Sequence, residues 1–167
     1  MPNRDFMRPA RYRGWIGAGI AVIALLIGCQ GSQIDGVAWQ TYTNSRYGFE
    51  FSYPAHWNAA PLPENRDGRA FHYPDDPRIE IRGWAGYDLV PRVKVPEPKT
   101  DNFTTQQGIE GQLSVRVGDR ISTMTLTFAR DRVRYCWQGR SPTPQFADYY
   151  QLFDASARRY RVPSLDP

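Results

Sequence analysis

The alternation of hydrophobic and polar positions is most regular between residues 113 and 137. Three segments there carry hydrophobic side chains at every second position: Leu113, Val115 and Val117; Met124, Leu126 and Phe128; and Val133, Tyr135 and Trp137. A period of two places such side chains on one face of a β-strand. Two-residue turns at Gly118-Asp119 and Arg130-Asp131 keep the three hydrophobic faces together, whereas a one-residue slip would scatter them. The pattern therefore predicts an antiparallel meander.

This register specifies which residues face one another across the strands. The expected pairs are Leu113 with Met124, Met124 with Trp137, Leu126 with Tyr135, and Phe128 with Val133. Because side chains alternate between the two faces, the same register places Cys136 on the polar face, between Arg134 and Gln138.

An aromatic strand is predicted near the start of the soluble part of the chain. Phe49, Phe51 and Tyr53 alternate with polar residues, which is typical of a strand with one aromatic face. Residues 44–48 have the composition of a turn, so Trp39 to Thr43 is the expected partner strand.

A second hairpin is predicted between residues 70 and 82, where Phe71, Tyr73, Ile79 and Ile81 alternate with polar residues. A connecting loop from Pro74 to Arg78 sets three cross-strand pairs, namely Tyr73 with Ile79, Phe71 with Ile81, and His72 with Glu80.

Residues 85–108 show no clear period. Pro91, Pro96 and Pro98 exclude a regular helix through the middle of this stretch. We expect a long crossover loop, with at most one short helical turn near Tyr87 to Val90. Loops of this length inside a compact domain are often functional.

The end of the chain predicts an amphipathic helix. Thr143 and Pro144 have the side chains expected at the N-cap and the first helical position. Hydrophobic residues then recur at steps of three and four: Phe146, Tyr149, Tyr150, Phe153, Ala157 and Tyr160. Pro163 is expected to stop the helix. Such a stripe has to be buried, and the hydrophobic face of the meander is the surface available.

Composition is consistent with one mainly β domain. The chain has 167 residues, of which 41% are hydrophobic and 23% are charged, which is typical of a globular protein. Fourteen glycines and fourteen prolines favour many turns and argue against a helix bundle. The predicted fold class is α+β, with an antiparallel sheet of about six strands, ending in the meander, packed against the C-terminal helix.

The first 28 residues have the features of an export signal. Arg4, Arg8, Arg11 and Arg13 precede a hydrophobic run from Trp15 to Ile27. That run has thirteen residues, which is shorter than the roughly 20 needed to span a bilayer. A basic start, a short hydrophobic run and small residues before a cleavage site are typical of a signal peptide.

The run ends in Leu26-Ile27-Gly28-Cys29, which resembles the lipobox of bacterial lipoproteins. The resemblance implies cleavage between Gly28 and Cys29 and attachment of lipid to the Cys29 thiol. The expected organisation is a signal peptide at 1–28, a polar tether at 29–38 and a domain at 39–163. The alternative is an uncleaved signal anchor.

The charge distribution argues against nucleic acid as a partner. The whole chain carries a formal charge of +4. Without residues 1–28, 17 basic residues face 16 acidic ones, because four arginines and one aspartate lie in the removed segment. Binding to phosphates needs a concentrated basic face.

Residues capable of catalysis or metal binding are few. His56 and His72 are the two histidines, and neither has the spacing of a metal site. Asp75 and Asp76 fit a turn between two prolines better than a calcium site. Cys136 is the one cysteine left if Cys29 carries lipid, so we expect a packed thiol, the alternative being a reactive one. We expect no cofactor, no metal and no enzymatic activity.

The segment from Tyr42 to Trp57, YTNSRYGFEFSYPAHW, resembles the opening of PsbP-like domains, in which a turn precedes Gly-Phe/Tyr-x-Phe-x-Tyr-Pro and a following Trp. The positions that carry the motif are Gly48, Phe49, Phe51, Tyr53, Pro54 and Trp57, and we expect them to pack the core. The resemblance implies an antiparallel sheet sandwiched by helices, the α/β/α fold that is shared with Ran-binding Mog proteins.

These observations favour a membrane-anchored extracytoplasmic lipoprotein with a non-catalytic domain. It would bind, or assist the assembly of, another envelope or thylakoid protein. The lipid would hold it on the outer face of the cytoplasmic membrane, on the outer membrane or on a thylakoid membrane. Two alternatives remain: a photosystem II extrinsic or assembly factor of the PsbP type, which the resemblance implies, and an enzyme or thiol protein that uses Cys136.

Overall fold

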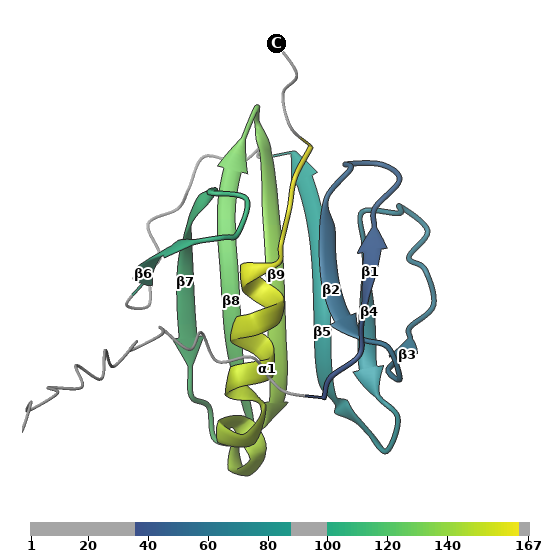
Figure 1. Cartoon of the computed structure of the whole chain (residues 1–167), viewed down its shortest axis with the longest axis vertical. Coiled ribbons are helices and arrows are strands. Elements are labelled where there is room, and N and C mark those ends of the chain that lie inside the picture. Colours follow the sequence, from purple (N-terminus) through teal and green to yellow (C-terminus); the bar gives the residue numbers. More distant parts are fainter. Residues whose placement is uncertain (1–35, 88–99, 164–167) are drawn as a thin grey trace, which may run out of the picture. The chain divides into compact units, whose positions relative to one another are not determined.

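The computed structural model describes residues 36–87 and 100–163. These residues form a seven-stranded sheet, a two-stranded sheet and one α-helix (Figure 1). The elements are β1 (Trp39–Thr43), β2 (Glu50–Pro54), β3 (Asn58–Ala59), β4 (Gly68–Tyr73), β5 (Asp76–Tyr87), β6 (Thr100–Thr104), β7 (Glu110–Arg116), β8 (Ile121–Arg130), β9 (Val133–Pro142), the 3₁₀ turn η1 (Thr143–Gln145) and α1 (Phe146–Arg158). The larger sheet has the order β3-β4-β5-β9-β8-β7-β6, and every pairing is antiparallel. The predicted α+β fold class is confirmed.

Three sequence predictions lie outside the described residues. They are the signal peptide at 1–28, most of the tether at 29–38, and the part of the crossover at 88–99. Gly28 and Cys29 therefore remain predictions. Within the described ranges, no helix is both long enough and apolar enough to cross a membrane.

The helix α1 and the β1–β2 hairpin cover the same face of the larger sheet (Figure 1). Two glycines permit this close packing. A Cβ atom on Gly83 of β5 would lie 2.7 Å from the Phe51 ring, and one on Gly139 of β9 would lie 2.5 Å from the Phe153 ring. Both distances are shorter than any real Cβ contact, so a larger residue at either position would push the covering layer off the sheet.

Aromatic rings fill the space between the two layers. Tyr160 stacks on Phe49 with 5.6 Å between ring centroids, and its ring meets Phe128 edge-on at 5.5 Å. Trp137 of β9 meets Phe153 of α1 at 6.5 Å. Four of these five side chains are fully buried. The layer is thus held by ring-to-ring contacts between segments far apart in sequence.

The meander is confirmed, but its predicted register is wrong by two residues. The observed pairs are Leu113 with Leu126, Met124 with Gly139, Leu126 with Trp137, and Phe128 with Tyr135. The connection between β7 and β8 is a four-residue loop at 117–120 instead of a two-residue turn. Because a shift of two preserves the face of every side chain, Leu126, Tyr135 and Trp137 still lie together in the core.

The position of the turn between β8 and β9 explains the register error between these two strands. It lies at Asp131-Arg132, one residue later than predicted, and both residues have positive φ, 51° and 64°. Positive φ at both central residues is the type I′ geometry, which usually selects Asn or Gly. In the other turn, Gly118 lacks the positive φ that a type II′ turn needs. The turn residues alone therefore misplaced both connections.

The β4–β5 hairpin agrees with the sequence except at its tip. Phe71 pairs with Ile81 and His72 pairs with Glu80, as predicted. Tyr73 pairs with Asp76 instead of Ile79, because the register shifts between His72 and Tyr73. The strand β5 thus begins three residues earlier than the alternation indicated.

The predicted loop at 85–108 is largely strand in its described parts. The strand β5 continues to Tyr87, which excludes Tyr87 from a helical turn, and β6 occupies residues 100–104 as the edge strand beside β7. Phe103 of β6 is buried in the core. A short edge strand with one core side chain leaves little periodic signal in the sequence.

The C-terminal helix is confirmed, although it starts differently from the prediction. Thr143 begins the 3₁₀ turn η1 and does not cap it, because no side-chain cap bond forms there. Its hydroxyl lies 2.6 Å from the carbonyl oxygen of Gly118, to which it donates. Thr143 therefore ties the start of the helical segment to the β7–β8 loop.

The helix also ends before the predicted stop. It ends at Arg158, five residues before Pro163. The chain then returns to the sheet, where Glu50 and Arg161 exchange two backbone hydrogen bonds of 2.9 Å. Tyr160 is therefore a core residue but lies beyond the helix.

Truncation of Phe153 tests the helix docking. Phe153→Ala is expected to destabilise the fold by about 3–5 kcal/mol, because it removes a fully buried ring and leaves a cavity against Gly139. Gln151→Ala, at an exposed position of the same helix, is expected to change stability by less than about 0.5 kcal/mol. Urea unfolding of the purified protein measures both. Equal effects would contradict the docking.

The Tyr160 hydroxyl is a buried polar group without a partner. Among the described residues, none forms a hydrogen bond with it, and the side chain is fully buried. Burial raises the pKa of Tyr160 well above its ordinary value, because the phenolate would be desolvated. The folded state therefore holds the neutral phenol.

This burial predicts a loss of stability in alkali. The phenol of the unfolded chain ionises near its ordinary pKa of about 10. The folded-state pKa of Tyr160 is higher. Stability is therefore retained below about pH 10 and falls as the pH rises past it. Tyr160→Phe is expected to be neutral or stabilising at pH 7, because it removes an unpartnered buried hydroxyl, and to flatten the alkaline decline. Thermal unfolding at pH 7 to 11 checks this, with Tyr150→Phe, at an exposed position, as the control.

Candidate functional site

The residues of the PsbP-like motif lie in the core. Phe49 and Phe51 are fully buried, and Trp57 is nearly so. Tyr53 stacks on Phe71 with 3.6 Å between ring centroids. Gly48 has a φ of +68°, and a Cβ atom there would lie 2.5 Å from the Pro163 side chain. These positions therefore mainly shape the fold, although Tyr53 is only partly buried and its hydroxyl donates to Gln40 Oε1 at 2.9 Å.

Cys136 lies on the face of the sheet opposite to Trp137. Its ladder partners are Trp84 of β5 and Thr127 of β8. The side chain is 7% exposed. A thiol that acts as a nucleophile needs access and a base. Because Cys136 is buried, its thiol lacks the access to solvent that a nucleophile needs.

The histidines and acids do not assemble into a metal site. In the part of the chain that the structure describes, no group of three potential ligands converges. Glu80, which faces His72 in the ladder, is bound by Arg82 and by Arg140, whose Nη2 atom lies 2.9 Å from Oε2. Both carboxylate oxygens of Glu80 are thereby hydrogen-bonded to arginines, so Glu80 is poorly placed to bind a metal ion.

The Asp75-Asp76 pair is likewise explained by a local contact. Arg78 donates two hydrogen bonds to the Asp76 carboxylate, at 2.8 and 2.7 Å. These bonds lower the pKa of Asp76 and raise the pKa of Arg78. Because the guanidinium already neutralises this carboxylate, the turn is poorly suited to calcium.

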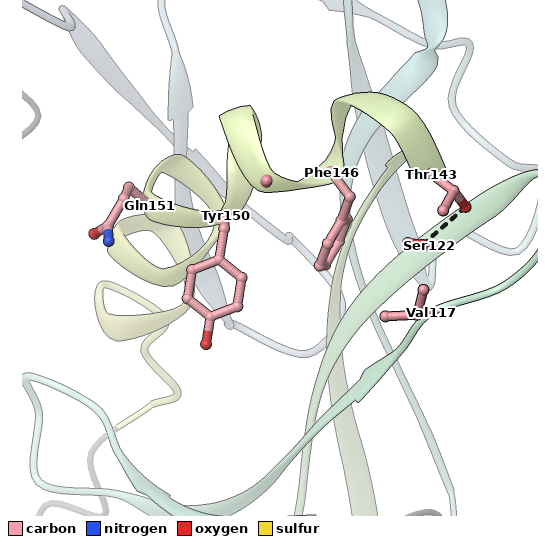
Figure 2. A pocket seen from close by; sticks show the side chains of 7 residues that line it. Val117, Ser122, Thr143, Phe146, Tyr150 and Gln151 are labelled. Atoms are coloured by element: carbon pink, nitrogen blue, oxygen red, sulfur yellow. Dashed lines mark hydrogen bonds between the residues drawn. The ribbon is translucent and has the colours of Figure 1, made fainter.

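The structure does form a groove between the start of the helical segment and the β7–β8 loop. Its volume is about 470 Å³, within the size range of ligand pockets. It is lined by Val117, Ser122, Thr143, Phe146, Ala147, Tyr150 and Gln151. Figure 2 shows Phe146 and Tyr150 extending from the helix on one side, with Val117 opposite them.

The lining of this groove is mostly apolar. Val117 is 72% exposed and Tyr150 is 38% exposed. The two aliphatic hydroxyls of the groove are used internally, since Ser122 Oγ and Thr143 Oγ1 lie 2.9 Å apart (Figure 2) and Thr143 also donates to Gly118. The lining contains no carboxylate, imidazole or amine. The groove therefore suits apolar contact and not acid–base chemistry.

Sequence reasoning missed this groove for two reasons. Val117 is expected on the core face of a strand, but β7 ends at Arg116 and the valine falls in the loop. Tyr149 and Tyr150 both belong to the predicted stripe. Successive residues on a helix point about 100° apart, so the pair could not both face the sheet. Only the docked helix shows that Tyr150 is the exposed one.

The sequence matches no protein-family model and no curated protein. Among solved structures, the chain is similar to cyanobacterial PsbP (CyanoP) from Synechocystis sp. PCC 6803. The TM-score is 0.55 at 14% sequence identity, over 83% of this chain and 99% of that one. It is also similar to a protein from Bacteroides thetaiotaomicron, with a TM-score of 0.50 at 10% identity, over 70% of this chain and 46% of that one. The chain therefore contains a domain with the PsbP-like fold.

Proposed function

We propose that this protein is a membrane-anchored extracytoplasmic lipoprotein whose PsbP-like domain binds another protein without catalysing a reaction. The observation that carries the proposal is the groove beside Phe146 and Tyr150. It is apolar, it is open to solvent, and it lacks titratable catalytic groups apart from a phenol. Exposed apolar surface of this kind is typical of sites that receive a partner's side chains.

The anchoring part of the proposal rests on the sequence around Cys29. A hydrophobic run after four arginines ends directly at Gly28-Cys29. A single acyl chain holds a protein on a membrane only reversibly, whereas two or more hold it firmly. Lipid on Cys29 would confine the domain to one surface and raise its effective concentration near membrane-bound partners.

A second candidate is a photosystem II extrinsic or assembly role. It is favoured by the similarity in fold to cyanobacterial PsbP. In a photosynthetic host, co-migration of the protein with photosystem II complexes on native gels would support this candidate. In a host without photosystems it does not apply, and an envelope protein is the proposed partner.

Lipid attachment is tested by mass spectrometry of the protein purified from its host membranes. The mature chain is expected to begin at Cys29 and to carry acyl chains on that residue. Cys29→Ser is expected to yield unprocessed precursor, because the modified thiol is the substrate that the signal peptidase of lipoproteins accepts. A mature protein that retains Met1 or carries an unmodified Cys29 would contradict the proposal.

Partner binding at the groove is tested by site-specific photocrosslinking in host cells. A photoreactive phenylalanine analogue at Val117 is expected to give one discrete adduct with another protein, because Val117 is 72% exposed at the groove wall. The matched control is Leu62, which is 52% exposed and does not line the groove. Similar adducts at both positions, or none at Val117, would argue against the groove as the site.

A further inference from the structure

A second exposed surface lies at the other end of the sheet. We call it the tyrosine–arginine end, and it comprises Arg46, Tyr47, Tyr87, Arg130 and Arg132. These residues come from the β1–β2 turn, the last residue of β5 and the β8–β9 turn. The β8–β9 turn is at the top of Figure 1, and the helix begins at the bottom. Because a strand rises about 3.3 Å per residue, Arg130 is roughly 26 Å from Ser122 in the groove.

The two tyrosines form an aromatic platform. Their rings meet edge-on with 6.1 Å between centroids. Tyr87 is 60% exposed, which is unusual for a large aromatic residue at the end of a strand in a sheet interior. Tyrosine and arginine are the residues most enriched among those that dominate binding at protein interfaces.

Two of the arginines are held in place before any partner arrives. The Arg46 guanidinium lies 5.0 Å from the centroid of the Tyr47 ring, and its Nη1 atom donates to the Asn65 carbonyl at 2.7 Å. Arg130 donates to the Pro163 carbonyl at 3.2 Å. Side chains already ordered in this way lose less entropy on binding.

The charge of this end is positive. Arg46, Arg66, Arg130 and Arg132 lie at its turns, whereas Glu64, Asp67 and Asp131 are the acids at the same turns, so the arginines exceed the acids by one. Asp131 lies 3.8 Å from Arg130 and is 68% exposed, so the ion pair leaves most of this carboxylate in water. The surface thus presents cations around an exposed ring, although the body of the chain is nearly neutral.

Arg132 stands at a position where the backbone favours glycine. Its φ is 64°, next to Asp131 at 51°. Left-handed backbone is unfavourable for a residue with a side chain, and Asn-Gly is the preferred pair in such a turn. The β8–β9 turn therefore carries an arginine side chain at a conformational cost, and strained backbone of this kind is typical of functional sites.

We propose that the tyrosine–arginine end binds an acidic segment of a protein, with carboxylates against Arg130 and Arg132 and an apolar side chain on Tyr87. This inference rests on the proposed protein-binding function and adds a second site with its own chemistry. A protein is favoured over a lipid surface because β1, which follows the proposed tether, begins at the opposite end of the domain (Figure 1). The tyrosine–arginine end and the start of β1 therefore lie at opposite ends of the domain.

The chain offers a matched pair of variants. The dipeptide Asp-Arg occurs at 119–120 in the β7–β8 loop and at 131–132 in the β8–β9 turn. D131N/R132G and D119N/R120G make the same chemical change at opposite ends of β8. Of the two variants, only D131N/R132G changes residues that have positive φ. This variant is therefore expected to keep or raise the unfolding temperature. Weaker binding by D131N/R132G could then not be ascribed to unfolding.

The test uses the full chain in detergent micelles and a fluorescein-labelled decapeptide of glutamates with one central leucine. Fluorescence anisotropy is expected to show binding that weakens as salt rises, because exposed charges are screened. D131N/R132G is expected to lower the affinity at least fivefold, and Tyr87→Ser at least threefold. D119N/R120G is expected to change the affinity less than twofold.

Three outcomes would overturn the proposal. They are no peptide binding by the unaltered chain, equal losses in the two double variants, and binding to vesicles of anionic lipid but not to the peptide. Failure of the peptide-binding proposal can be distinguished from failure of the proposed function, because a different measurement tests each site. The Val117 adduct reports on the groove and is expected to persist in D131N/R132G, so a lost adduct with retained peptide binding would count against the groove alone.

Discussion

Burial of one aromatic layer is the constraint on which this domain depends. The larger sheet has a hydrophobic face that has to be covered, and α1 and the β1–β2 hairpin cover it side by side. Tyr160, which follows α1 in the chain, connects the helical segment to the hairpin and to the sheet. Its ring stacks on Phe49, next to β2, and meets the Phe128 ring of β8 edge-on. Ser156 adds a direct link, since its hydroxyl donates to the Ser52 carbonyl at 2.5 Å. The helix and the hairpin therefore contact each other as well as the sheet, and they form one covering layer.

This arrangement accounts for where exposed side chains can gather. The middle of the covered face is filled by rings and by the close contact of Phe153 with Gly139. Side chains remain exposed at both ends of the strands. At one end, the start of the helical segment leaves Tyr150 and Val117 beside a groove. At the other end, the turns carry Tyr87 and arginines. Both surfaces therefore lie at the ends of the strands, away from the rings that fill the middle of the covered face.

Among the described residues, no three potential metal ligands converge. The polar face of the sheet does carry charged groups, but they bind one another. Glu80 is held between Arg82 and Arg140, and Asp76 is bound by Arg78. The Asp76–Arg78 pair, whose arginine is exposed, stabilises little, whereas Glu80 is buried and depends on its arginine partners. Arg78 lowers the pKa of Asp76, which is the opposite of the raised pKa that a general acid uses.

The sequence by itself determined most of the strands, the faces of their side chains and the helix, but not the edge strands β3 and β6. It did so because alternation and a stripe at steps of three and four are local properties that follow from backbone geometry. Register needed the tertiary structure: Leu126 pairs with Trp137 across a turn at Asp131-Arg132, whose left-handed backbone the turn residues by themselves do not favour. The groove and the tyrosine–arginine end were equally invisible, since each collects residues from separate segments that only the folded chain brings together.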